Sequence, residues 1–272
     1  MGNERQEKIN ELERLGLFDR DIEDDPPTRE IKPDEIEYVK KNLWQKIKTD
    51  FAFFLAYRYA AKAEKEKALI IKEVIGAENL NTPGGVILTA NHFSPLDSFI
   101  MHRTFDLSGR KGKLYRIIKE GNYTSFPGFY GFLMRNCNTL PLSSNPATMR
   151  KFMRGVDEIL KGGQCVLIYP EQSMWYNYRK PKPLKSGAFD LAVRSGVPVV
   201  PCFITMNDSD VTGPDGEPVQ EHTVHVGKPI YPDESLSRRE RAEKMMKENF
   251  EFNKSVYESF YKINLEYLTK DN

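Results

Sequence analysis

The sequence predicts an α/β fold built on a mostly parallel sheet flanked by helices, with an N-terminal helical extension that docks on a membrane. Three apolar runs support this prediction, at residues 86–90, 165–169 and 197–204. Each run is short and continuously apolar, as expected of a strand that is buried on both faces of a parallel sheet. A glycine shortly before each run indicates a turn that leads into the strand. Helical patterns separate the runs, and parallel neighbours need such crossover connections.

The composition narrows the class of protein. A chain of 272 residues suits one large domain with an extension, and it can bury a core without disulfides. Lys and Arg number 40 against 39 Asp and Glu, so no overall charge points to nucleic acid. The three cysteines are widely spaced and form no Cys-x-x-Cys pair, which argues against a disulfide framework and a zinc site. We therefore expect no nucleic-acid partner and no metal.

The chain divides into three parts. Residues 1–32 form a charged N-terminal segment, for which the acidic patch and Pro26-Pro27 predict a short helix followed by a flexible linker. Residues 33–78 form an amphipathic helical region, and residues 79–272 form the α/β domain with a C-terminal helix. The start of the chain lacks the pattern of a signal peptide, and the longest apolar run, 51–57, is too short to cross a bilayer. These features predict an intracellular protein.

The helical region 33–75 carries an aromatic stripe. Pro33 and the acidic residues after it predict its start. Apolar residues recur at helical spacing, at Leu43, Ile47, Phe51, Phe54 and Leu55, and Trp44 lies next to them. Four lysines flank this stripe: Lys40, Lys41, Lys46 and Lys48. Such a helix can lie in a membrane interface or pack on the core of its own protein, and the pattern leaves both open.

The remaining elements follow in order. We expect a strand at 113–119, an aromatic segment at 126–134 and an extended stretch at 139–142. A helix at 146–160 leads to the strand 165–169, and a second helix at 186–195 leads to the strand 197–204. A turn-rich loop at 208–221, a strand at 222–230 and a charged terminal helix at 236–267 complete the chain.

His92 and Asp97 form the first candidate site. The strand 86–90 ends just before His92, and Ser94-Pro95 predicts a helix start with Ser94 as the N-cap. Asp97 then lies in the first helical turn, from which its carboxylate can reach back to the imidazole. A carboxylate on one ring nitrogen fixes the tautomer and leaves the other nitrogen as a general base. The alternative is that Asp97 only caps its helix.

Glu171 follows the strand 165–169 as His92 follows the strand 86–90. Because the carboxyl ends of parallel strands meet at one edge of an open sheet, we expect both side chains at that edge.

The chain contains four motifs in this order: Asn91-His92 with Asp97; Phe126-Pro-Gly-Phe-Tyr-Gly131; Tyr169-Pro-Glu-Gln-Ser173; and Lys185-Ser-Gly-Ala188 before Val197-Pro-Val-Val-Pro201. In this order and spacing the chain resembles the glycerolipid acyltransferase family, over about residues 80–230. The 1-acylglycerol-3-phosphate acyltransferases are its best-known members.

The resemblance implies a reaction. In the family, the motif histidine deprotonates an acceptor hydroxyl, which attacks the thioester of acyl-CoA or acyl-carrier protein directly. Carried over, His92 is the base and Asp97 orients it, and the thioester is a co-substrate, with no cofactor. The implied acceptor is a lysophospholipid such as 1-acylglycerol-3-phosphate. A different, non-phosphate lysolipid acceptor, an acyl-thioester hydrolase and a non-catalytic lipid or carrier-protein binder remain as alternatives.

The resemblance also implies binding residues and a location. Glu171 matches the glutamate of the family motif Phe-Pro-Glu-Gly-Thr-Arg, which helps hold the acceptor, and Ser173 and Gly131 lie in matched motifs. The chain departs from the family in two places, because Gln172-Ser173-Met174 replaces Gly-Thr-Arg and Ser144 stands where a second motif usually ends in arginine. Arg179, Lys180, Lys182 and Lys185 of the basic loop 179–185 could supply the missing charge to a phosphate. The insoluble acceptor places the protein peripherally on the inner, cytoplasmic face of the cell membrane.

Overall fold

A seven-stranded sheet forms the centre of the molecule, which a computed structural model describes for residues 2–22 and 28–269. The strands lie in the order β1-β7-β6-β2-β5-β3-β4. All neighbours are parallel except β6 and β7. The strands are β1 (Ile70–Ile75), β2 (Val86–Thr89), β3 (Leu114–Ile118), β4 (Thr139–Pro141), β5 (Cys165–Ile168), β6 (Val199–Thr212) and β7 (Pro218–Val226). The predicted fold class, a mostly parallel α/β sheet, is confirmed.

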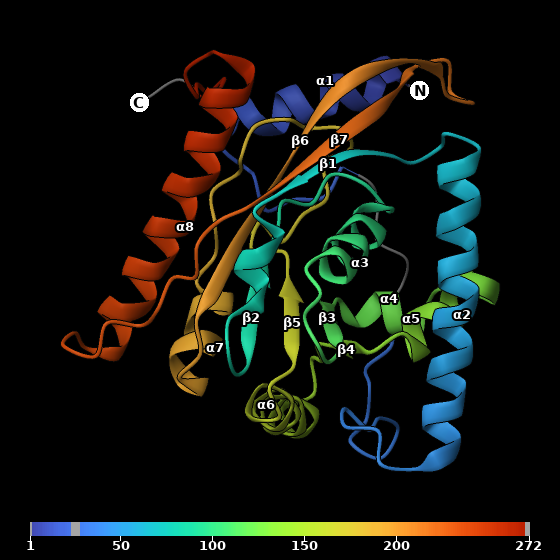
Figure 1. Ribbon diagram of the computed structural model, residues 1–272, viewed down its shortest axis with the longest axis vertical. Coiled ribbons are helices and arrows are strands. Elements are labelled where there is room, and N and C mark those ends of the chain that lie inside the picture. Colours follow the sequence, from blue (N-terminus) through green and yellow to red (C-terminus); the bar gives the residue numbers. More distant parts are fainter. Residues whose placement is uncertain (1, 23–27, 270–272) are drawn as a thin grey trace.

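Helices cover both faces of this sheet (Figure 1). In chain order they are α1 (Gly2–Arg14), α2 (Leu43–Lys65), the 3-10 helix η1 (Ala77–Asn81), α3 (Asp97–Leu107), α4 (Glu120–Thr124), α5 (Gly128–Asn136), α6 (Pro146–Lys161), α7 (Gly187–Ser195) and α8 (Arg238–Tyr261). The predicted helices at 146–160 and 186–195 correspond to α6 and α7.

Successive side chains of β2 and β5 point to opposite faces of the sheet, and this divides the core into two clusters. Ile87 and Val166 belong to a cluster with residues of α6, α7 and α8, whereas Leu88 and Leu167 belong to a second cluster with residues of α3. These strand residues have an exposed fraction of 0%. Both faces of β2 and β5 are thus apolar, which explains why these strands are continuous apolar runs in the sequence.

The N-terminal segment is more ordered than the sequence suggests. The helix expected there is α1, but residues 15–22 do not behave as a linker, because Ile9 and Ile22 pack with Trp175 and Tyr178 of the loop after β5. Part of the predicted linker, residues 23–27, lies outside the described residues. Beyond it, Ile31 is buried in the core beside α6.

The long helix predicted at 33–75 is wrong at both ends. Residues 33–42 form turns that bury Ile36 and Tyr38, and the Tyr38 hydroxyl donates to the Pro141 carbonyl at 2.9 Å. The helix α2 begins only after Asn42, whose side chain accepts from the Trp44 N–H. It ends before Lys67, which has a positive φ of 56°. The β-branched residues from Ile70 onward form β1 instead.

The end of the chain also differs from the prediction. The stretch 208–221, expected to be a loop, mostly extends β6 and β7 into an antiparallel pair, in which Asn207 pairs with Glu221. Its alternating exposed and half-buried residues form a two-stranded ribbon that turns at 213–217. The last helix is shorter than 236–267: it ends at Tyr261, and the C-cap Lys262 is left-handed with φ 59°.

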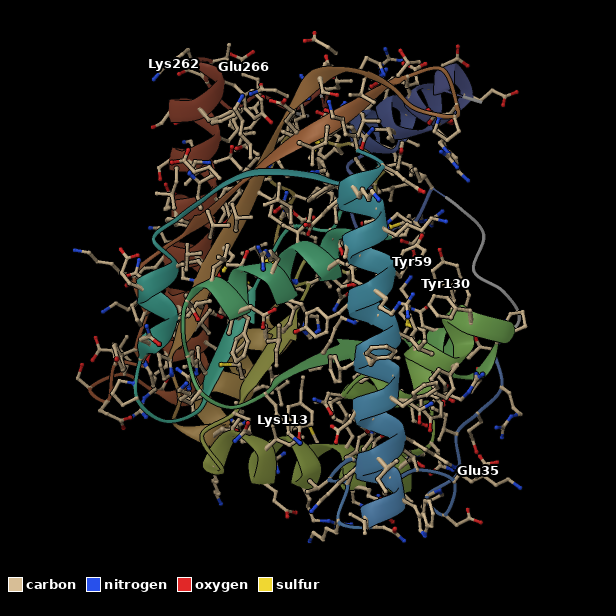
Figure 2. The ribbon with its side chains drawn as sticks, turned by 45° about the vertical axis from the view of Figure 1, so that its right-hand side comes forward. Glu35, Tyr59, Lys113, Tyr130, Lys262 and Glu266 are labelled. Atoms are coloured by element: carbon tan, nitrogen blue, oxygen red, sulfur yellow. The ribbon has the colours of Figure 1, made fainter. Side chains whose placement is uncertain are left out.

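The aromatic stripe of α2 faces away from the core. The helix buries the small residues Thr49, Ala52, Ala56 and Ala63, which let it approach α5 closely. Six of its large apolar side chains remain exposed: Leu43 69%, Trp44 71%, Ile47 46%, Phe51 53%, Phe54 53% and Tyr57 45%. Leu55, which the sequence placed in the same stripe, packs with Phe53 against the cluster shared with α5. Figure 2 shows α2 in full, with Tyr59 directed toward Tyr130 of α5, and their hydroxyls lie 2.8 Å apart. Among the described residues, none of the helices is long and apolar enough to cross a membrane.

Candidate active site

His92 and Asp97 lie in direct contact at the carboxyl end of β2. The His92 Nδ1 and the Asp97 Oδ2 are 2.5 Å apart. The Asp97 side chain is 2% exposed and the His92 side chain 27%, so the carboxylate is shielded while one edge of the imidazole reaches the surface. With Nδ1 held by a carboxylate, the ring is oriented and Nε2 is left to interact with a substrate.

The strand exit before His92 is fixed by Asn91. Its amide donates to the Ile204 carbonyl at 2.9 Å and accepts from the Ile204 N–H at 2.8 Å, which joins the end of β2 to β6. The predicted N-cap is wrong, because Ser94 belongs to a turn and α3 begins at Asp97. The Asp97 carboxylate turns back to His92 and the Phe93 N–H instead of capping the helix. The capping alternative therefore does not describe this aspartate.

Tyr169 is a site residue for which the sequence analysis assigned no role. Its hydroxyl donates to the Asp97 Oδ1 at 2.9 Å, and its ring stacks on the His92 imidazole with 4.3 Å between centroids and 19° between planes. Burial and the neighbouring Asp97 carboxylate raise the pKa of Tyr169 well above its ordinary value, so the phenol stays a donor. The available signal was the tyrosine itself, since the family motif has phenylalanine there.

Glu171 lies at the same edge, as its position after β5 predicts, but its oxygens are already engaged. Oε2 accepts from the His92 N–H at 3.2 Å, and Oε1 accepts from the Lys182 N–H at 3.1 Å. The Lys182 ammonium lies 3.4 Å from Oε2, and the two side chains are only 1% and 2% exposed. Burial raises the pKa of Glu171 and lowers that of Lys182. Glu171 thus ties the loop after β5 to the loop after β2.

Lys182, which we expected to offer its charge to a phosphate, is buried instead, although a lysine in a basic loop is normally solvated. Its ammonium donates to the backbone carbonyl and the hydroxyl of Ser173, both at 2.7 Å, and lies 5.0 Å from the centre of the Trp175 ring. Ser173 is buried, and its hydroxyl donates to the Phe18 carbonyl at 2.6 Å. These contacts place Ser173 in the support of the loop, below the surface.

The N-terminal segment covers this loop and supplies counter-charges. Lys185 pairs with Asp19 at 2.8 Å, and both side chains are about half exposed. Asp21 accepts from the Met174 N–H at 2.7 Å and also pairs with Lys119, at the end of β3. Lys119 after β3 and Lys185 in the loop after β5 are therefore neutralised by the chain's own carboxylates.

The other predicted binding residues are dispersed. Arg179 pairs with Asp208 at 2.6 Å on the β6–β7 ribbon, and Lys180 pairs with Glu13 of α1 at 2.7 Å. Gly131 lies in α5 against the Phe126 carbonyl, where a Cβ atom would come within 1.8 Å, so the position admits no side chain.

The two positions at which the chain departs from the family are also engaged within the protein or conformationally restricted. Ser144, where an arginine was expected, donates through its hydroxyl to Glu120 at 2.9 Å. Gln172, at the glycine of the family motif, has a positive φ of 63°. Of the predicted residues, His92, Asp97 and Glu171 come together with direct contacts.

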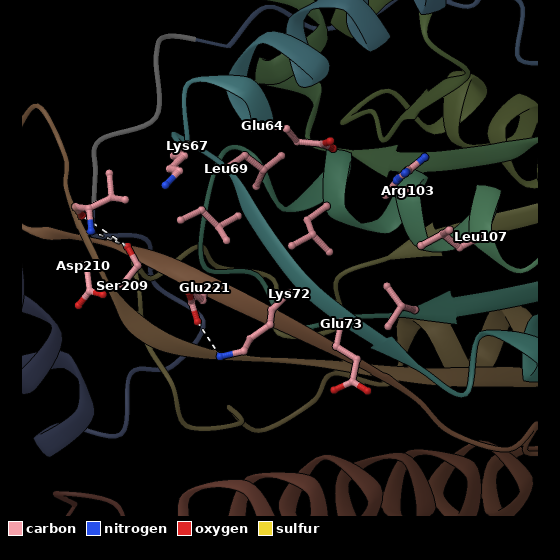
Figure 3. A pocket seen from close by; sticks show the side chains of 14 residues that line it. Glu64, Lys67, Leu69, Lys72, Glu73, Arg103, Leu107, Ser209, Asp210 and Glu221 are labelled. Atoms are coloured by element: carbon pink, nitrogen blue, oxygen red, sulfur yellow. Dashed lines mark hydrogen bonds and ion pairs between the residues drawn. The ribbon is translucent and has the colours of Figure 1, made fainter.

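A separate hollow of about 500 Å³ lies between the end of α2, β1, α3 and the β6–β7 ribbon (Figure 3). Apolar residues such as Leu69 and Leu107 share its lining with charges of both signs, including Arg103 and Glu221. Its lining, as far as residues are described, includes none of the predicted site residues. It is distinct from the His92–Asp97 site.

The comparisons with known proteins agree with the motifs. Residues 72–205 match the family model described as Acyltransferase. The chain is 28% identical over 143 residues to the 1-acyl-sn-glycerol-3-phosphate acyltransferase of Saccharomyces cerevisiae, covering 52% of this chain and 45% of the relative. It is 30% identical over 167 residues to a chloroplastic 1-acyl-sn-glycerol-3-phosphate acyltransferase of Brassica napus, covering 58% and 45%. The chain thus spans less than half the length of these curated relatives.

One solved structure adds to the comparison. The 1-acyl-sn-glycerophosphate acyltransferase of Thermotoga maritima aligns with 79% of this chain and 84% of its own, at 20% identity and a TM-score of 0.46. The matched residues 72–205 contain His92, Asp97, Tyr169 and Glu171, in the order that the motifs require. The chain is thus similar to glycerolipid acyltransferases, and the residues that match the Acyltransferase family model make up just under half of it.

Proposed function

We propose that this protein transfers a fatty acyl group from acyl-CoA or acyl-carrier protein to the free hydroxyl of a lysophospholipid such as 1-acylglycerol-3-phosphate. The observation that supports this most directly is the 2.5 Å contact between His92 and a buried Asp97 at the carboxyl end of β2. The named activity of the two curated relatives supports the choice of acceptor.

In the proposed step, His92 Nε2 removes the proton of the acceptor hydroxyl as its oxygen attacks the thioester carbon. A C–O bond forms and the C–S bond breaks, and the imidazolium returns its proton to the leaving thiolate. Asp97 stabilises the transient imidazolium and holds its ring. The scheme has no acyl-enzyme and needs no cofactor besides the thioester co-substrate.

The acceptor phosphate would bind to the basic residues at this edge. Lys185 is the best placed, because it sits in the matched motif and its ammonium is half exposed, although Asp19 now neutralises it. A phosphate could exchange with this exposed carboxylate at little cost, since exposed ion pairs contribute about 0–1 kcal/mol. Arg179 would add charge further out, whereas the contacts of Glu171 and Ser173 favour support of the loop over contact with the acceptor.

The enzyme would meet its lipid substrate through α2. The exposed side chains of Trp44, Phe51 and Phe54 form an apolar face that the rest of the molecule leaves uncovered. Lys46, Lys48 and Arg58 of the same helix are exposed and would attract anionic headgroups. Lys40 and Lys41, which we expected to contribute, are engaged elsewhere, with the Asn136 carbonyl and with Glu158. We therefore propose an anionic membrane surface as the partner, met from the cytoplasmic side where the acyl donors are made.

The proposal is tested with the purified protein and its His92→Ala variant. Lysophosphatidate is supplied with acyl-CoA or acyl-carrier protein, and the lipid product and free thiol are both measured. We expect acceptor-dependent phosphatidate formation that falls by roughly 10²- to 10⁴-fold in the variant, the usual loss for a general base. Release of free fatty acid without an acceptor would indicate a hydrolase, and unchanged transfer by the variant would refute the mechanism.

A further inference from the structure

Both carboxylate oxygens of Asp97 have a partner in the site, and the partner of Oδ1 is a second aromatic side chain. Oδ2 lies on the His92 Nδ1, while Oδ1 accepts a hydrogen bond from the Tyr169 hydroxyl at 2.9 Å. The same tyrosine covers one face of the imidazole, with 4.3 Å between ring centroids. One side chain therefore touches both members of the His92–Asp97 pair.

We propose that Tyr169 is a positioning residue that holds the Asp97 carboxylate and the His92 ring and weakens the carboxylate as a partner for the imidazolium. This inference rests on the proposed function. The O–H donor withdraws negative charge from Asp97, which stabilises a protonated His92 less as a result.

The other charged groups around the pair are few. Glu171 accepts from the backbone N–H of His92, and Lys182 pairs with Glu171. Burial raises the pKa of Tyr169, and the charge of Arg116 partly offsets this rise. Burial lowers the pKa of His222, which stacks on Phe93, and the charge of Asp97 partly offsets this fall. Among the described residues, only Tyr169 donates a hydrogen bond to Oδ1, so removal of its hydroxyl changes one contact and leaves the rest.

The test is Tyr169→Phe, which keeps the ring and removes the donor. We expect the acidic limb of the kcat/KM profile to move to higher pH by roughly half a unit or more, since loss of the donor strengthens the His92–Asp97 pair. The matched control is Tyr38→Phe, which removes another buried phenol, bonded to the Pro141 carbonyl away from the site. The control should lower stability and leave the limb where it is.

A readout without turnover separates this inference from the proposed function. The chain has four histidines, so the ring signals of His92 can be assigned in NMR spectra by comparison with His92→Gln. Its titration midpoint should rise in Tyr169→Phe and not in Tyr38→Phe, whether or not acyl transfer is found. An unchanged or lowered midpoint would overturn the role of Tyr169, while a raised midpoint without transfer would leave that role standing and reject the acceptor chemistry.

Discussion

Two lysines of one loop show how strongly the surroundings of a residue decide its role. Lys182 is 1% exposed and carries the charge that balances the buried Glu171. Lys185 is 46% exposed and pairs with an equally exposed Asp19. In the sequence both belong to one basic stretch, and burial, which the sequence does not reveal, separates them. We therefore expect opposite phenotypes from the same substitution.

Lys182→Met should destabilise the fold by about 3–5 kcal/mol, because it leaves Glu171 buried without its cation. Lys185→Met should change stability by less than about 1 kcal/mol, as exposed pairs do. It should instead raise the KM for a phosphate-bearing acceptor and leave the KM for the acyl donor unchanged. Urea unfolding and steady-state kinetics on the two variants check both halves. Equal stability losses would contradict the assignment, and an unaltered acceptor KM would remove Lys185 from the acceptor site.

At the scale of elements, the sequence predicts best where one physical signal dominates. Continuous apolar runs locate β2 and β5, and the approach of His92 to Asp97 follows from a short turn between strand and helix. The helix predicted at 33–75 is wrong because local periodicity cannot show that residues 33–42 are held by α6 and β4. Tyr169 and Lys182 acquire their roles only through contacts made across the fold.

The residues that α2 buries are small, whereas several of its large apolar side chains, among them Trp44, Phe51 and Phe54, face outward. The variant Trp44→Ala/Phe51→Ala/Phe54→Ala should therefore remain folded and lose binding to anionic liposomes in co-sedimentation. Binding by the parent should weaken with salt, because the lysine contribution is screened. Tyr231→Ala/Ile263→Ala, which removes exposed apolar side chains outside α2, is the control and should bind like the parent. Equal binding by all three proteins would move the docking surface elsewhere.

At the scale of the molecule, segments far apart in sequence fasten the active edge. Residues 15–22 hold the loop after β5 through the Phe18 and Arg20 carbonyls, which accept from Ser173 and Trp175. From the other end of the chain, the Tyr267 hydroxyl donates to the Pro181 carbonyl at 2.7 Å, and its ring lies against Phe18. The loop that positions His92 is thus secured by both ends of the described chain.

The antiparallel pairing of β6 with β7 suggests that the region matched by the family model is too small to fold by itself. The family match ends at residue 205, inside β6, and the strand that satisfies its backbone on one side begins at Pro218. A fragment of residues 72–205 would expose a long unpaired edge, which favours aggregation. We expect that fragment to be insoluble or unfolded by circular dichroism, whereas the full chain is folded; a soluble, cooperatively folded fragment would contradict this. The strand ends that carry His92 and Glu171 therefore depend, for their own folding, on a strand that lies outside the region matched to the family.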